Sequence, residues 1–68
     1  SSLLDSLAAA LQESSLEEAA EKLHIHINTL RYRLGKIKEI TQKNYFKLSD
    51  RYFLSLCIMI QKMENQAL

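Results

Sequence analysis

Residues 16–41 read LEEAAEKLHIHINTLRYRLGKIKEIT, and this stretch decides the fold because it holds two helical patterns in succession. The first pattern places four apolar residues on one helix face: Leu16, Ala19, Ala20 and Leu23. Ser15 and Glu18 have the S-x-x-E spacing of a capping box, which predicts that this helix begins near Leu16. The second pattern begins near Ile27, and its apolar side carries Leu30, Leu34, Ile37 and Thr41. Only three residues separate the two patterns, so we predict a helix-turn-helix over about residues 16–41.

The link between these two helices must turn sharply without glycine or proline. Many helix-turn-helix motifs use glycine at this point, and here His24 holds that place. Histidine is one of the few non-glycine residues that tolerate a positive φ angle. We therefore expect His24 at the turn, and the small Ala19 and Ala20 leave room for another helix to approach closely.

Further helices are predicted on both sides of the motif. The stripe Leu4, Leu7, Ala8 and Leu11 predicts a helix over about residues 3–12 with Ser2 as its N-cap. Ser49 can cap a last helix over about residues 50–65. In that helix, eight of the nine residues 52–60 are apolar or aromatic, which is typical of a helix buried on more than one side. It is therefore either the central helix of the bundle or part of an interface with a second molecule.

The composition predicts an all-α fold. The 68 residues include one Gly and no Pro, and leucine is frequent. We predict one domain over residues 1–68, a small bundle of four to five helices with the helix-turn-helix inside it. A chain of this length has no room for a two-domain enzyme or a deep substrate pocket, and no apolar stretch is long enough to span a membrane. The aromatic residues predicted to lie in the core are Tyr45, Phe46, Tyr52 and Phe53.

The cysteine and the histidines are not expected to serve a metal or a reaction. A single cysteine cannot form an intramolecular disulfide, which favours a reducing, cytoplasmic setting, and Cys57 is expected to be a small core residue. His24 and His26 are too few ligands for a closed zinc site. The sequence also lacks a phosphate-binding glycine loop and a base directed at Cys57, so we expect no cofactor and no enzymatic activity.

The net charge of +1 is the sum of an acidic N-terminal part and a basic C-terminal part of the chain. Residues 1–23 carry five acidic residues and one Lys, a net charge of −4, whereas residues 24–68 carry eight basic and three acidic residues, a net charge of +5. Seven basic residues fall close together: Arg31, Arg33, Lys36, Lys38, Lys43, Lys47 and Arg51. A basic patch of this kind can be a solvated face, but on the second helix of a helix-turn-helix it indicates binding to double-stranded DNA.

The polar face of the second helix is predicted to contact bases. Its centre is formed by Asn28, Tyr32, Gly35 and Glu39. In a helix-turn-helix the second helix enters the major groove with its N-terminal residues near the base edges. Asn28 can form two hydrogen bonds with adenine and Arg31 can do so with guanine, while Tyr32 offers a hydroxyl group and a flat apolar ring.

The flanks of the same face are predicted to contact the DNA backbone. Thr29, Arg33 and Lys36 are placed for phosphates, which set the register and most of the affinity rather than the sequence preference. Gly35 marks either a close approach to DNA or another helix, or a glycine that the helix tolerates at a cost of about 1 kcal/mol.

The segment 19–41, AAEKLHIHINTLRYRLGKIKEIT, resembles the C-terminal helix-turn-helix domain of the PucR/CdaR family of bacterial transcription regulators. The specific part is the run His26–Leu34, H-x-N-T-L-R-Y-R-L, and the likeness extends over nearly the whole chain. The resemblance implies sequence-specific binding to a DNA operator in the cytoplasm, and it adds His26 to the contacting residues. It also implies a sensory region N-terminal to this domain, so the chain is expected to be a C-terminal fragment of a larger regulator.

The sequence departs from the family pattern in two places. Ile27 stands where the family usually has Arg, so a DNA contact is lost or is replaced by apolar contact with a thymine methyl group. Glu17 and Glu18 lie in the first turn of the preceding helix, where they suit the helix dipole but would repel a phosphate. Both features predict altered specificity or weak binding by the isolated domain.

The apolar last helix leads to two expectations about protein partners. In a DNA-binding protein, Tyr52–Ile60 would form the interface of a homodimer that binds two half-sites. The alternative is a helical protein-interaction module that uses residues 50–65 to dock onto a partner or the rest of its own chain. That alternative predicts binding that salt does not weaken and that does not need Arg31 and Arg33.

Overall fold

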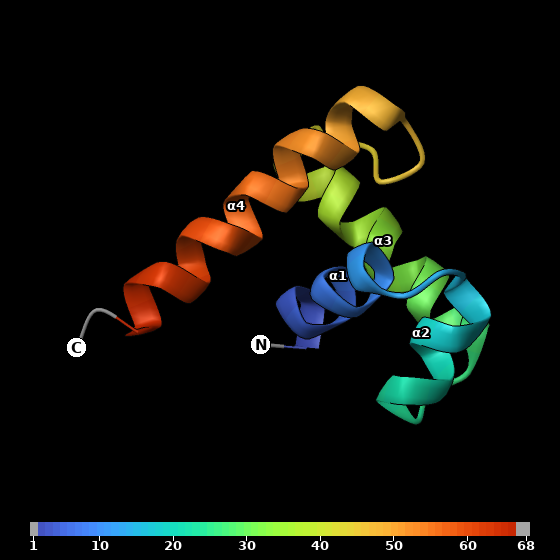
Figure 1. Ribbon diagram of the computed structural model, residues 1–68. Helices are drawn as coiled ribbons and strands as arrows, with labels where there is room; N and C mark the ends of the chain where they lie inside the picture. The colour runs from blue at the N-terminus through green and yellow to red at the C-terminus, as the bar shows by residue number, and fades with distance from the viewer. Residues whose placement is uncertain (1, 67–68) are drawn as a thin grey trace.

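A computed structural model describes residues 2–66, and within them the fold consists of four α-helices and no strand (Figure 1). The helices are α1 (Ser2–Gln12), α2 (Leu16–Leu23), α3 (Ile27–Thr41) and α4 (Leu48–Gln66). The predicted all-α class is confirmed, with four helices rather than five. The helix-turn-helix consists of α2 and α3, with the predicted bounds.

Local side chains begin both helices of the motif. The Ser15 hydroxyl accepts a hydrogen bond from the Glu18 backbone N–H at 3.1 Å, as the capping box predicts. The Nδ1 atom of His26 accepts a hydrogen bond from the Asn28 backbone N–H at 3.0 Å. These bonds satisfy N–H groups that a helix leaves without partners in its first turn.

The turn between α2 and α3 depends on His24, which has φ 58° and ψ 41°. Its N–H donates to the Glu21 carbonyl, and the N–H of Ile25 donates to the Ala20 carbonyl, each at 3.0 Å. This pair of bonds is the Schellman motif, in which glycine usually occupies the left-handed position. The expected role of His24 at the turn is confirmed.

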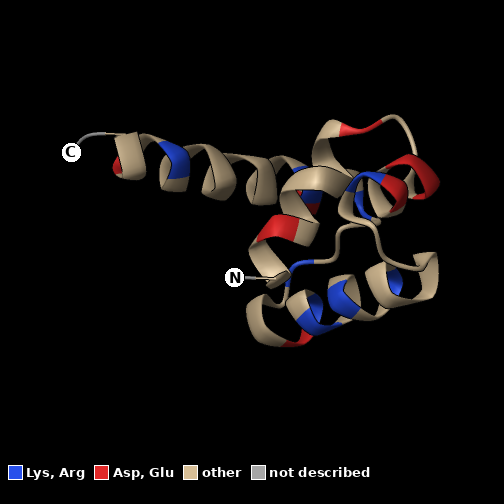
Figure 2. Cartoon of the chain, turned by 90° about the horizontal axis from the view of Figure 1, so that it is seen from below, with Lys and Arg blue, Asp and Glu red and all other residues tan. Residues whose placement is uncertain are grey.

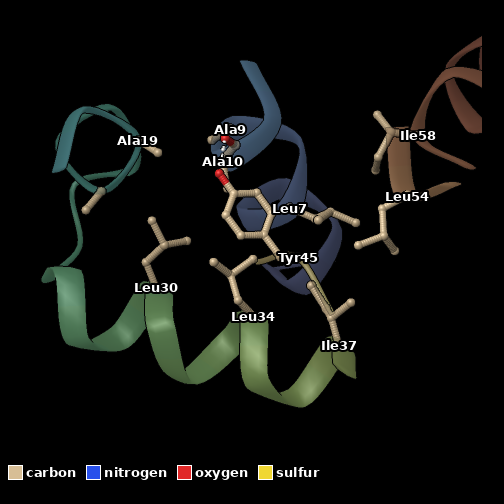
Figure 3. Packing of buried hydrophobic residues seen from close by; sticks show 11 residues of the cluster. Leu7, Ala9, Ala10, Ala19, Leu30, Leu34, Ile37, Tyr45, Leu54 and Ile58 are labelled. Atoms are coloured by element: carbon tan, nitrogen blue, oxygen red, sulfur yellow. Dashed lines mark hydrogen bonds between the residues drawn. The ribbon is translucent and has the colours of Figure 1, made fainter. Parts of the chain in front are cut away.

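The core forms where α1 lies across the motif and α4. Its buried apolar members are Leu7, Ala9, Ala10, Ala19, Ala20, Leu30, Leu34, Ile37, Tyr45, Leu54 and Ile58. Helix α3 contributes one side of this core, and its Leu30, Leu34 and Ile37 point towards α1 and α2 (Figure 3). The alanines of α1 and α2 let the backbones approach closely, and burial of these eleven side chains stabilises the arrangement.

The segment between α3 and α4 is held by Tyr45. The Tyr45 hydroxyl donates a buried hydrogen bond of 2.8 Å to the Ala10 carbonyl in the last turn of α1 (Figure 3). The guanidinium of Arg51 lies 4.7 Å from the centre of the Tyr45 ring. The contact therefore joins the end of α1, the linker and the start of α4.

Both terminal helices begin earlier than predicted. Ser2 lies inside α1 and Ser49 lies inside the first turn of α4, so neither residue caps its helix. At α4 the Arg51 N–H donates to the Lys47 carbonyl at 2.9 Å, which moves the helix start ahead of Ser49. The Asp50 carboxylate instead accepts a hydrogen bond from the backbone N–H of Asn44 in the preceding linker.

Several residues predicted to be buried are exposed. Phe46, Tyr52 and Phe53 are 59%, 66% and 48% exposed, Cys57 is exposed, and so is Thr41 of α3. The reason is that α4 covers α1 with one face only, through Leu54 and Ile58, while its C-terminal half extends away from the other helices (Figure 1). Of the two interpretations of the apolar run, burial at the centre of the bundle is therefore wrong.

Candidate nucleic-acid interface

The side of α3 that faces away from the core carries the three residues predicted to contact bases, together with Gly35 and the acidic Glu39, which is also exposed. Asn28, Arg31, Tyr32 and Gly35 are all exposed, and Tyr32 is 65% exposed. The helical repeat brings them together opposite the buried stripe of Leu30, Leu34 and Ile37. We call these four exposed residues the outer face of α3. The apolar hollows against α1 and α4 lie elsewhere, because α3 contributes only Ile37, Ile40 and Thr41 to them.

The two helices of the motif differ in charge. Helix α3 carries four basic residues and one acidic residue, a net charge of +3, and α2 carries three acidic residues and one Lys, a net charge of −2. Figure 2 shows basic bands along α3 and acidic bands on α2. Glu17 and Glu18 are exposed in the first turn of α2, where they suit the positive end of the helix dipole. Within the motif, the positive charge is therefore concentrated on α3.

Arg31 has no bonding partner within the part of the chain that the structure describes. Its side chain is exposed and takes part in no hydrogen bond or ion pair there. A guanidinium in this state can turn both of its parallel N–H groups towards an acceptor pair. Guanine presents such a pair in the major groove.

Lys36 interacts with two side chains of its own helix, Glu39 and Tyr32. Its Nζ lies 3.3 Å from a carboxylate oxygen of Glu39 and 5.6 Å from the centre of the Tyr32 ring. The hydrogen bond to the Glu39 carboxylate, and then the charge of that group, raise the pKa of Lys36 above its usual value. The ammonium group is therefore positively charged at neutral pH and lies beside Tyr32.

Arg33 is tied to α1. Its Nη1 donates a hydrogen bond of 3.0 Å to the hydroxyl of Ser6, which is fully buried and itself donates to the Ser2 carbonyl at 2.7 Å. The sequence predicted Arg33 as a phosphate contact and did not single out Ser6. The sequence offers only one hint of this hydrogen bond, which is a serine near the buried positions of an apolar helix. The partner of that serine, Arg33, lies 27 residues further along the chain. The guanidinium has five N–H donors, so most remain available.

The remaining predicted residues lie at the start of α3. His26 is exposed, and because its Nδ1 accepts from Asn28, a neutral ring carries its proton on Nε2, where it can be donated outward. Thr29 is half-buried on the flank of the helix. Ile27 is partly buried and packs against the core cluster, so much of its side chain supports the fold.

His24 and His26 do not form part of a larger group of metal-binding side chains. Among residues 2–66, no three histidine, cysteine or acidic side chains come together as a metal site would need. Of the helices in that range, none has the length and apolar character that a membrane crossing demands.

Comparison with known proteins places this arrangement in a family. The model of the PucR C-terminal helix-turn-helix domain matches residues 3–60. Over 36 residues, 53% of this chain, the sequence is 50% identical to the uncharacterized protein YsfB of Bacillus subtilis (strain 168). Over 51 residues, 75% of this chain, it is 43% identical to an uncharacterized protein of Haemophilus influenzae.

The chain is short beside these relatives. The matched segments make up 10% of the first protein and 14% of the second. No solved structure matches the chain significantly. The family match covers the helix-turn-helix and most of the flanking helices, and the predicted resemblance is confirmed. The chain belongs to the family of PucR C-terminal helix-turn-helix domains.

Proposed function

We propose that this chain is the sequence-specific DNA-binding domain of a bacterial transcription regulator and that α3 enters the major groove of double-stranded DNA. The observation that carries the proposal is the exposed outer face of α3, on the second helix of a helix-turn-helix with a net charge of +3. A helix of this kind fits the major groove, and its charge attracts the phosphate backbone.

Asn28, Arg31 and Tyr32 contact bases in this proposal. They lie in the first two turns of α3, the part of the second helix that comes nearest to base edges in helix-turn-helix complexes. The Asn28 amide forms two hydrogen bonds with adenine and the Arg31 guanidinium forms two with guanine. The Tyr32 ring, with Lys36 beside it, reaches a thymine methyl group or a neighbouring backbone oxygen.

His26, Thr29, Arg33 and Lys36 contact the phosphate backbone. The His26 Nε2 proton and the Thr29 hydroxyl act at the start of α3, and Lys36 acts through its charge. Arg33 uses the N–H groups that Ser6 leaves unused. These contacts set the register of α3 in the groove and supply salt-dependent affinity.

Gly35 supports an external partner for this face. Apart from its chain neighbours and the nearby backbone of its own helix, a Cβ atom added at Gly35 would meet no described atom within 4 Å, so no packing against another element requires glycine there. Glycine inside a helix costs about 1 kcal/mol of stability relative to alanine. Close approach of DNA to the outer face of α3 would account for the glycine at this position of the helix.

The domain acts within a larger protein in this proposal. Because the curated relatives are several times longer than the matched segment, we propose that a sensory region precedes the domain in a cytoplasmic, nucleoid-associated regulator. We also propose that two copies bind two half-sites of one operator through the last helix, since helix-turn-helix domains commonly bind as symmetric pairs. The domain itself is a binding module rather than an enzyme.

Binding to duplex DNA at several salt concentrations tests the proposal. We expect affinity to fall steeply with salt, and Arg31→Ala to weaken binding by about tenfold or more through a lost base contact of about 1–3 kcal/mol. Lys62→Ala is the matched control, because it also removes one exposed positive charge but lies on α4, away from α3. Absence of binding at low salt, or equal losses in both variants, would contradict the proposal.

A further inference from the structure

Opposite its buried residues Leu54 and Ile58, α4 carries a second apolar stripe, and two members of the stripe, Met59 and Phe53, also border the hollows between α4 and α1. Tyr52, Leu56, Met59 and Met63 follow one another at spacings of four, three and four residues and are 56–66% exposed. Phe53 and Ile60 lie beside them and are 48% and 54% exposed. We call these six residues the α4 outer stripe.

This pattern is that of a coiled-coil seam. Alternating steps of three and four residues keep side chains on one line along a helix and allow them to interlock with a second helix. Leu54 and Ile58, which pack against α1, lie on the opposite side of α4. One helix therefore has two apolar faces, and the fold of one chain covers only one of them.

The exposed area is large enough for a stable pair. Large side chains carry about 150–250 Å² each, so the stripe exposes roughly 600 Å². Two such faces together would bury about 1,200 Å², the lower end of the range of specific protein interfaces. An apolar patch of that extent lies at the upper end of what monomers expose, and patches of this kind often mark interaction sites.

We infer that the α4 outer stripe binds the same stripe of a second copy of this chain, with the two α4 helices antiparallel. The inference deepens the proposed dimer by naming the residues that pair and the orientation of the two helices. It rests on the proposed function only for its role on DNA. The other possible occupant, a different region of a larger protein, is an outcome of the test below.

Charge favours the antiparallel arrangement. The linker and first turn of α4 carry Lys43, Lys47 and Arg51 against Asp50, a net charge of +2, whereas the C-terminal turns carry Lys62 and Glu64, which cancel. Parallel helices would bring two positive ends together. Antiparallel helices place each positive end against a neutral one, which lowers the repulsion.

The side chains also match in this arrangement. With the two-fold axis midway along the stripe, Tyr52 of one copy meets Met63 of the other, and Leu56 meets Met59. Sulfur–aromatic contacts such as the first pair are favourable, and methionine adapts to the shape of its neighbour.

Sedimentation equilibrium without DNA tests the pairing. We expect the chain to form dimers, and Leu56→Asp and Met59→Asp to raise the dissociation constant by about tenfold or more, because each would bury an unpaired charge. Asn65→Asp is the control: it adds the same charge to α4 away from the stripe and should leave the dimer intact. Circular dichroism checks that each variant is folded. A chain that stays monomeric at high concentration, or equal weakening by all three variants, would overturn the inference.

Disulfide cross-linking tests the orientation in a Cys57→Ser background. When Leu56→Cys and Met59→Cys chains are mixed and oxidised, we expect the mixed dimer to link faster than either chain links to itself. Faster self-linking would show parallel helices and overturn the orientation. Binding of monomeric Leu56→Asp to a single half-site is measured separately, so failure of the pairing and failure of DNA binding give different results.

Discussion

At the scale of single residues, His24 shows how the motif turns without glycine. Its φ of 58° lies in the left-handed region, where a side chain costs about 1–2 kcal/mol relative to the usual helical conformation. Histidine, asparagine and aspartate bear this cost more easily than β-branched residues do. The Schellman hydrogen bonds of His24 and Ile25 hold the conformation in place.

Substitutions at His24 should change stability according to that backbone conformation. We expect His24→Val to lower the free energy of unfolding by about 1–2 kcal/mol, because a β-branched side chain fits the left-handed region poorly. His24→Gly should preserve stability or raise it by up to about 1 kcal/mol. Urea denaturation followed by circular dichroism measures both. Equal stability of the two variants would show that the turn does not depend on this residue.

The hydrogen bond between Arg33 and Ser6 could not be predicted from the sequence. The charge of Arg33 and its place on α3 predicted a phosphate contact, yet one of its N–H groups is bound to a buried hydroxyl on α1. That bond depends on how α1 crosses α3, and the spacing of residues within α3 does not determine this crossing. The outer face of α3 was predictable because helical periodicity alone determines which residues lie opposite the core.

At the scale of elements, the boundaries of α2 and α3 followed from local chemistry. The capping box at Ser15 and the resumption of apolar periodicity at Ile27 predicted both helices with the observed bounds. Helix α4 was predicted less well, because Tyr52, Phe53 and Cys57 were assigned to the core. A bundle of this size covers only one face of that helix, so Tyr52 and Phe53 remain exposed.

The end of α1 depends on a contact from the linker. The last four carbonyls of a helix have no partner within it, and the Tyr45 hydroxyl satisfies that of Ala10 in a buried setting. We expect Tyr45→Phe to lower the free energy of unfolding by about 1–3 kcal/mol, because it leaves that carbonyl unsatisfied. Tyr32→Phe makes the same chemical change at a site that is 65% exposed, and it should shift stability by no more than about 0.5 kcal/mol. Thermal and urea unfolding compare the two, and equal losses would contradict the role of Tyr45.

At the scale of the whole molecule, the fold separates two surfaces. Helix α1 lies between the motif and α4, so the outer face of α3 and the α4 outer stripe belong to different parts of the chain. The net charge of +1 hides this organisation, since the positive charge is concentrated on α3 and the linker and the negative charge on α2. We propose double-stranded DNA as the partner of the first surface and a second copy of α4 as the partner of the other.

The central claim is that α3 binds a specific DNA sequence. Selection of bound duplexes from a random pool by the purified 68-residue chain tests it most directly. We predict enrichment of a defined motif, arranged as two half-sites related by two-fold symmetry, with an altered preference at one position for Asn28→Ala. Recovery of duplexes with no enriched sequence would contradict it.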